Sequence, residues 1–359
     1  MSAALRHIRP VSLLLGMTAL IASTTVARAA TVQPDDPRLS YEGRYAVGPA
    51  HDVRLGFPGI TLRLRVNASA VRLKLHASSN DVFFKLSVDG QPARKIRVHQ
   101  GDSEIPLLAA STAAEHAIEL IRITESWEGV CEFTGLDVDG TILPPPALPS
   151  RKLLFIGDSI TCGEGVVPNA PGLTAPERTD ATESYGMKLA RRLGAQCELV
   201  SYGGRGVIRD WQGIRATNNA PQFYELALPD DPKTRWNPAT YVPDAIGICL
   251  GTNDFSQGIP DENEFVNAYV EFIRKIQRDA PHAPIFLIDS PILTDADIPK
   301  RTVCGAYLDE VIRKVDSPLL HHAHLRHYQG SEGDGHPVAA EQTSMTDELE
   351  PVFRKALGW

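Results

Sequence analysis

A proline-rich stretch divides this chain into two parts with different periodicities. Residues 143–149 read Leu-Pro-Pro-Pro-Ala-Leu-Pro, and four prolines within seven residues predict a stiff, extended linker. Before it, apolar and polar residues alternate with a period of two. After it, short apolar runs alternate with segments of helical spacing. We therefore expect two domains, at 30–143 and 151–359, joined by a linker at 144–150.

The first part has the pattern of an antiparallel sheet. Residues 61–66, 71–75 and 119–123 alternate apolar and polar side chains, and Asp89-Gly90 has the composition of a hairpin turn. Because no helical segment separates these strands, we expect an all-β sandwich of jelly-roll type. Its Lys and Arg residues are most simply a solvated outer face, and a basic binding face is the alternative.

The second part has the pattern of a parallel sheet. Four apolar residues at 153–156 predict a strand buried on both faces, and similar runs follow at 197–201, 245–250, 284–289 and 319–325. Helical spacing is found at 183–193, 265–276 and 303–312, and a last helix is expected at about 343–357. This alternation predicts an α/β domain with helices on both faces of the sheet.

Polar and glycine-rich blocks follow three of these strands. They are Gly157-Asp158-Ser159, Gly203-Gly204 and Gly251-Thr252-Asn253-Asp254. The carboxyl ends of parallel strands share one edge of the sheet, so the Ser159 hydroxyl, the Gly204 N–H and the Asn253 amide should lie together. Acyl transfer needs such a nucleophile and such donors. An ordinary turn for the first block and a helix cap for Asn253 are the alternatives.

A base for the serine is expected in the segment Gly333-Asp334-Gly335-His336-Pro337. It follows the last predicted strand and precedes the last predicted helix. His336 could accept the serine proton, and Asp334 could fix the tautomer of the imidazole. The alternative is a surface histidine in a glycine-rich turn.

Four histidines lie close together near the end of the chain, at His321, His322, His324 and His327. In a strand, His322 and His324 would share a face. No acidic or cysteine ligand stands at a diagnostic spacing from them, so the sequence predicts no metal site and no cofactor.

The first 29 residues have the features of a secretory signal peptide. Arg6 and Arg9 form a basic start, residues 11–26 are apolar or small, and an Ala-Arg-Ala site stands at 27–29. The apolar run is short and interrupted, which disfavours the alternative of a membrane anchor. We expect a secreted or periplasmic protein that is not held at a membrane after cleavage. Its net charge of -8, with scattered Lys and Arg, disfavours nucleic acid as a partner.

The five cysteines show no metal-binding spacing; they are Cys131, Cys162, Cys197, Cys249 and Cys304. Disulfides are open to an exported protein, but an odd number leaves at least one thiol unpaired. Cys162 follows Ser159 by three residues and could be a reactive thiol. We favour a packed thiol, because its local sequence contains no base.

The four ordered blocks, ending in His336-Pro337, resemble those of the SGNH (GDSL-type) hydrolases. The stretches 157–163, 201–207 and 334–337, behind a jelly-roll domain, are similar to carbohydrate esterase family two. Members of that family remove acetyl groups from plant cell-wall polysaccharides such as xylan and glucomannan. The resemblance implies Ser159 as nucleophile and His336 as base. It also implies an oxyanion hole made by the Ser159 N–H, the Gly204 N–H and the Asn253 side chain.

One position departs from the wider superfamily pattern. Many SGNH hydrolases place the aspartate three residues before the histidine, where this chain has Gly333, whereas Asp334 stands two before. In the narrower family some members orient the histidine with a backbone carbonyl instead. Either Asp334 or a carbonyl is therefore expected to orient His336.

The function expected from these features is that of a secreted serine esterase acting on acetylated polysaccharide or oligosaccharide without a cofactor. Tyr202, Trp211 and Trp236 lie near the second and third blocks and are candidates for stacking on a sugar ring. Ordinary packing is the alternative for each of them. A lipase or thioesterase, and a non-catalytic carbohydrate-binding protein, are the alternative functions.

Overall fold

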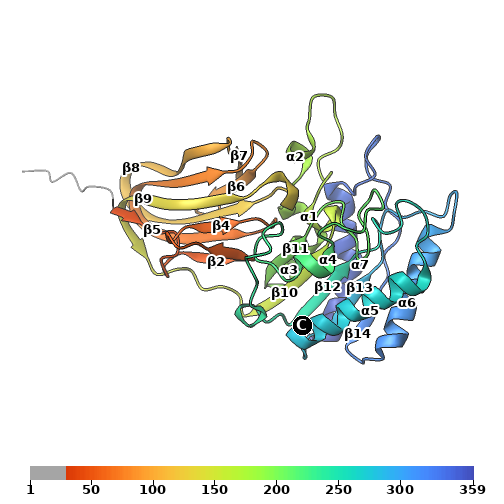
Figure 1. Ribbon diagram of the computed structural model, residues 1–359. Helices are drawn as coiled ribbons and strands as arrows, with labels where there is room; N and C mark the ends of the chain where they lie inside the picture. Colours follow the sequence, from red (N-terminus) through yellow and green to blue (C-terminus); the bar gives the residue numbers. More distant parts are fainter. Residues whose placement is uncertain (1–29) are drawn as a thin grey trace, which may run out of the picture.

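The computed structural model describes residues 30–359, and the predicted signal peptide lies outside this range. An antiparallel β-domain packs beside an α/β domain (Figure 1). The strands of the first are β1 (Ala30–Val32), β2 (Ser40–Glu42), β3 (Tyr45–Val47), β4 (Val53–Leu55), β5 (Thr61–Ala77), β6 (Phe83–Val88), β7 (Arg94–Arg97), β8 (Gly101–Arg122) and β9 (Cys131–Leu143).

The predicted all-β class of the first part is confirmed. Its nine strands form one antiparallel sheet in the order β3-β4-β9-β5-β8-β6-β7, with β1 on β9 and β2 on β5. The strands predicted at 61–66 and 71–75 are one strand, β5, because a shift in register between Ala68 and Ala70 bends it without breaking it. The turn at Asp89-Gly90 is present, with both residues in the left-handed region at φ 54° and 68°.

The second part is the predicted α/β fold. Its sheet is parallel, in the order β11-β10-β12-β13-β14. The strands are β10 (Arg151–Gly157), β11 (Ala195–Ser201), β12 (Ala245–Cys249), β13 (Ile285–Ile288) and β14 (Leu320–Ala323). The helices are α1 (Ser159–Cys162), α2 (Ala175–Arg178), α3 (Tyr185–Leu193), α4 (Ala220–Phe223), α5 (Glu262–Asp279), α6 (Lys300–Val315) and α7 (Ala339–Leu357). Within residues 30–359, no helix combines the length and apolar character needed to cross a bilayer.

The strand order explains both the apolar run in β10 and the position of the polar blocks. Leu153 and Phe155 pack with residues of α3 and α7, whereas Leu154 and Ile156 pack in the cluster that includes α5, so both faces of β10 are buried. The connections from β10 and from β12 leave the sheet at neighbouring strand ends. In sheets of this order a ligand crevice forms where the strand order reverses, here between β10 and β12.

A buried ion pair joins the two domains. Arg44 of the β-domain donates to Glu198 on β11 over 2.5 Å, and the two side chains are 2% and 1% exposed. The guanidinium also donates to the Tyr224 carbonyl and lies 5.1 Å from the centre of the Trp236 ring. Because Arg44 and Glu198 neutralise each other away from water, each charge depends on the other domain.

Replacing Arg44 with methionine should therefore destabilise the protein strongly. We expect a loss of about 3–5 kcal/mol, because Glu198 is left buried without its counterion. Urea unfolding followed by tryptophan fluorescence would measure it. Arg274, half exposed and paired with Glu271 within α5, is the matched control, and Arg274→Met should change the midpoint little. An Arg44→Met protein as stable as the wild type would contradict this role for the ion pair.

Candidate active site

Ser159 stands at the first position of α1, directly after β10. Asp158 precedes the helix and accepts a hydrogen bond from the Ile160 N–H at 3.1 Å, which fixes the turn out of the strand. The turn brings the Ser159 hydroxyl to the floor of a pocket at the carboxyl edge of the sheet. The predicted strand end is thus a tight strand-to-helix turn.

His336 and Asp334 lie next to this hydroxyl. The Nε2 atom of His336 is 2.8 Å from Ser159 Oγ, and its Nδ1 atom is 2.6 Å from Asp334 Oδ1. Asp334 also accepts the His336 backbone N–H at 3.1 Å and pairs with Arg178 at the end of α2. The structure brings the three residues together in one hydrogen-bonded row, with a carboxylate on the ring nitrogen that faces away from the serine.

Charge around the imidazole favours its protonated form. The hydrogen bond from His336, together with a second one from the Arg178 guanidinium, holds the pKa of Asp334 far below its ordinary value. Burial would lower the pKa of His336, but the bond to Asp334 and the charge of Glu164 raise it to about 9. The Glu164 carboxylate lies 3.9 Å from Nε2. An imidazole with this pKa is mainly neutral, and so able to accept a proton, only in alkaline solution.

The loop that carries Glu164 passes close to His336 because of a glycine. Gly165 has φ +70°, and a Cβ atom there would lie 2.5 Å from the His336 Cβ. A larger residue would push the histidine away or distort the loop. Glu164 itself was not among the residues selected from the sequence, although it follows Ser159 by only five positions.

The other two predicted blocks meet at the same place. Gly204 has φ +75°, and a Cβ atom there would lie 2.8 Å from Trp211. The Asn253 amide donates to the Arg205 carbonyl at 2.9 Å and to Asp158 at 3.2 Å. The backbone N–H groups of Ser159 and Gly204 donate to no residue within 30–359. Two free N–H groups and an amide therefore border the same pocket as the serine hydroxyl.

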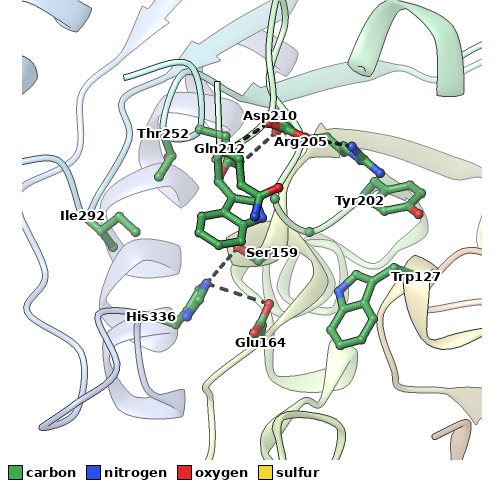
Figure 2. A pocket seen from close by; sticks show the side chains of 14 residues that line it. Trp127, Ser159, Glu164, Tyr202, Arg205, Asp210, Gln212, Thr252, Ile292 and His336 are labelled. Atoms are coloured by element: carbon green, nitrogen blue, oxygen red, sulfur yellow. Dashed lines mark hydrogen bonds and ion pairs between the residues drawn. The ribbon is translucent and has the colours of Figure 1, made fainter. Parts of the chain in front are cut away.

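The pocket has a volume of about 550 Å³ and is lined by aromatic, polar and charged side chains (Figure 2). Trp127 and Trp211 are 47% and 55% exposed, unusually high values for indoles. Ser159 lies between His336 and Trp127 in the view of Figure 2. The lining residues are Trp127, Ser159, Glu164, Tyr202, Gly203, Gly204, Arg205, Asp210, Trp211, Gln212, Thr252, Asn253, Ile292 and His336.

Trp127 belongs to the β-domain and was missed by the sequence reasoning. It lies in a short 3₁₀ turn (Ser126–Glu128) between β8 and β9. Ser126 donates to the Ser201 carbonyl at 2.6 Å, and Glu125 accepts the Gly203 N–H at 3.0 Å. These bonds fasten the turn to the loop after β11. No local pattern marks such a residue, because its place in the pocket depends on how the two domains pack.

The three predicted sugar-stacking residues have different positions. Tyr202 and Trp211 line the pocket, but Tyr202 is largely buried and its hydroxyl donates to Asp230 at 3.0 Å. Trp236 lies outside this pocket and packs on Arg44 at the domain interface. For Trp236, the structure therefore favours the packing alternative over contact with substrate.

The five cysteines are unpaired and buried. The Cys162 thiol donates to the Ser201 hydroxyl at 3.1 Å. Burial raises the pKa of Cys162 well above its ordinary value, and the neighbouring Glu125 adds to the shift. A buried thiol of this kind carries little thiolate, which favours the packed thiol over a reactive one.

Two family models match the chain. Residues 41–146 match the model described as carbohydrate esterase 2 N-terminal, and residues 155–337 match the GDSL-like lipase/acylhydrolase family. An acetylxylan esterase / glucomannan deacetylase of Cellvibrio japonicus is 33% identical over 331 residues, which are 92% of each chain.

Solved structures agree with this assignment. A family two carbohydrate esterase from Cellvibrio japonicus has 33% identity and a TM-score of 0.89, over 92% of this chain and 98% of that one. A family two carbohydrate esterase from Clostridium thermocellum, solved in complex with cellohexaose, has 27% identity and a TM-score of 0.83, over 89% and 99% of the two chains. The chain is therefore a carboxylic ester hydrolase that belongs to carbohydrate esterase family two.

Proposed function

We propose that this protein is an exported serine esterase that removes acetyl groups from the hydroxyls of plant cell-wall polysaccharides, such as xylan and glucomannan, or of their oligosaccharides. The observation that carries the proposal is the hydrogen bond of 2.8 Å between Ser159 and His336 on the floor of a pocket walled by exposed indoles. The similarity to an acetylxylan esterase / glucomannan deacetylase supports this substrate class.

In the first half of the reaction, Ser159 Oγ attacks the acetyl carbonyl and His336 Nε2 takes its proton. Asp334 holds the imidazole through Nδ1 and stabilises the cation that forms. The Ser159 N–H, the Gly204 N–H and the Asn253 amide donate hydrogen bonds to the negative oxygen of the tetrahedral intermediate. The bond from Asn253 to this oxygen replaces its 3.2 Å bond to Asp158. His336 then gives its proton to the sugar oxygen, which leaves as an alcohol.

In the second half, water attacks the acetyl group now bonded to Ser159. His336 removes a proton from that water, and the same three donors hold the second negative oxygen. The proton passes to Ser159 Oγ when the bond to the acyl carbon breaks, so acetic acid leaves and the enzyme is restored. The cycle consumes one ester and one water and needs no other reactant.

The lining of the pocket favours a sugar over a long acyl chain. Its two exposed indoles suit the apolar faces of sugar rings, and Glu164 and Gln212 can bond hydroxyl groups. A lipase would need an extended apolar channel for its acyl chain. The polar wall at this site is a reason to rank the lipase alternative lower.

Export is part of the proposal. The pattern of residues 1–29 supports a signal peptide that is cut after Ala29. Mass determination of the protein recovered from the periplasm or the medium of an expressing cell would locate the new N-terminus. A full-length chain retained in the cells would argue against export.

Removing members of the proposed triad should abolish turnover without unfolding the protein. Ser159→Ala and His336→Ala should each lower kcat on the order of 10⁴-fold or more. Asp334→Asn should cost on the order of 10³-fold, because the amide cannot hold the same tautomer. Hydrolysis of 4-nitrophenyl acetate measures the rates, and circular dichroism checks the fold.

Asp347→Asn, an exposed carboxylate on α7, is the control and should keep wild-type activity. Normal activity in Ser159→Ala would refute the mechanism. If kcat of Asp334→Asn stays within tenfold of the wild-type value, another group, such as a backbone carbonyl, orients His336.

The pH dependence should report His336. Because the base must be neutral, kcat/KM should rise with pH through the pKa of about 9. Glu164→Gln removes a negative charge 3.9 Å from Nε2, so this rise should move to lower pH, by roughly 0.7 unit for a solvent-screened pair. Rates with 4-nitrophenyl acetate between pH 6 and 10 would test it. If kcat/KM of Glu164→Gln rises at the same pH as that of the wild type, Glu164 is not a cause of the raised pKa of His336.

Acyl-chain selectivity separates the deacetylase from the lipase alternative. We expect kcat/KM for the 4-nitrophenyl ester of acetate to exceed that of octanoate roughly tenfold or more, because the pocket offers polar groups to a longer chain. The enzyme should also release acetate from acetylated xylan and glucomannan. Equal rates on octanoate would favour a lipase.

A further inference from the structure

The carboxyl ends of β13 and β14 gather a carboxylate and two imidazoles outside the active-site pocket. Leu287 pairs with His322 in the sheet, and Asp289, just beyond β13, donates its N–H to the Ala323 carbonyl at 3.2 Å. Asp289 therefore lies beside His324. His322 and His324 share a face of the strand, as their spacing predicts, and their ring centres are 4.0 Å apart.

The side chains of these residues converge. Asp289 Oδ1 lies 2.7 Å from His322 Nε2, and its Oδ2 lies 3.2 Å from His324 Nδ1. One ligand atom from each of the three residues can be chosen so that all lie within 4.8 Å of one another. The neighbouring His321 belongs to the other face of the strand, where it stacks on Phe286 at 5.2 Å, so it takes no part.

We propose that Asp289, His322 and His324 form a binding site for a divalent transition-metal ion, with Zn²⁺ as the best-suited ion. Two imidazole nitrogens and one carboxylate oxygen are ligands that Zn²⁺ takes in proteins, whereas Mg²⁺ and Ca²⁺ prefer sites made of oxygens alone. His324 is 74% exposed, so solvent has access and water can complete the coordination.

Binding an ion requires local side-chain movement, since the three ligand atoms lie within 4.8 Å of one another before it binds. Ligands about 2.0–2.1 Å from a tetrahedral Zn²⁺ are about 3.3–3.4 Å from one another. The contact between His322 Nε2 and Asp289 Oδ1, now 2.7 Å, would have to open by about 0.6 Å. The contact of His324 Nδ1, at 3.2 Å, is made to the other oxygen of Asp289, so the two imidazoles must turn toward one shared ion. The ion would take the place of the hydrogen that now lies between His322 Nε2 and the carboxylate, so this proton leaves when the ion binds.

A fourth side chain already has the position of an orienting group. Asp309, on α6, lies 2.7 Å from the Nδ1 atom of His322. Histidines that bind a metal through one nitrogen usually donate the other N–H to a carboxylate, which fixes the ring. The His322 side chain is only 8% exposed, so its ring is held between α6 and the strand end even before an ion arrives.

The ion would stabilise a segment that reaches the pocket. The residue after Asp289, Ser290, bonds the Thr252 hydroxyl at 2.7 Å, and Thr252 and Ile292 both line the pocket. The site is separate from the proposed row of Ser159, His336 and Asp334. We therefore assign it a structural role in fixing the pocket wall, without a part in the ester chemistry.

Calorimetric titration of the tag-free, chelator-treated protein with ZnCl₂ tests the proposal. We expect one ion per chain and no comparable heat with MgCl₂. His324→Ala should weaken binding at least tenfold, and Asp309→Asn roughly 10–100-fold, because the ring loses its orienting group. Both positions are exposed, so the variants should fold.

Two control variants make the outcome decisive. His327→Ala removes an exposed imidazole three positions beyond His324 and should leave the affinity within about twofold of wild type. His336→Ala should also retain binding, which excludes the ester site. Titration with Co²⁺ should give a visible absorption band that His324→Ala loses. The proposal is overturned by an absence of saturable Zn²⁺ binding, or by equal losses in His324→Ala and His327→Ala.

Discussion

The buried carboxylate of Asp254 is the anchor on which the geometry of the pocket depends. It follows β12 by five positions and accepts the N–H groups of Val207 and Ile208 at 2.8–3.0 Å and that of Arg209 at 3.3 Å. It thereby ties the loop after β11 to the end of β12. Burial raises the pKa of Asp254 to about 6, although the three N–H groups favour the charged form. Hydrogen bonds shielded from water are strong, so one side chain sets the spacing between two blocks that are far apart in sequence.

The β-domain takes part in the site as a wall of the pocket. Arg122 is fully buried and donates to the carbonyls of Leu55, Glu125 and Gly129, which holds the turn that carries Trp127. The same turn is also hydrogen-bonded to Ser201 and Gly203, at the end of β11 and in the loop after it. The backbone that carries the indole is therefore held relative to Ser159 by hydrogen bonds from both domains, even though the ring itself protrudes into solvent. Rigid aromatic walls lose little conformational entropy when a ring stacks on them.

Periodicity and strand-end chemistry predicted the α/β sheet and the meeting of Ser159, Gly204 and Asn253. Both depend on rules that act along the chain, since parallel strands place their carboxyl ends at one edge. His336 was predicted only together with these blocks, from its place between the last strand and the last helix. The positions of Trp127, Glu164 and Asp289 depend on packing between elements instead. No spacing connects Asp289 with His322, because they meet through the register of two neighbouring strands. The exposure of an aromatic residue is equally a property of the tertiary structure, so the sequence left both packing and sugar contact open for Trp236, which packs on Arg44.

The ion pair between Arg44 and Glu198 has a consequence for how such a chain can be inherited. Neither charge has a partner within its own domain to replace the other, and both lie away from water. A recombination event that transferred one domain without the other would leave a buried, uncompensated charge and expose the apolar surface shared between them. The two domains are therefore expected to be passed on together, because division at the proline-rich linker would strand one buried charge in each half.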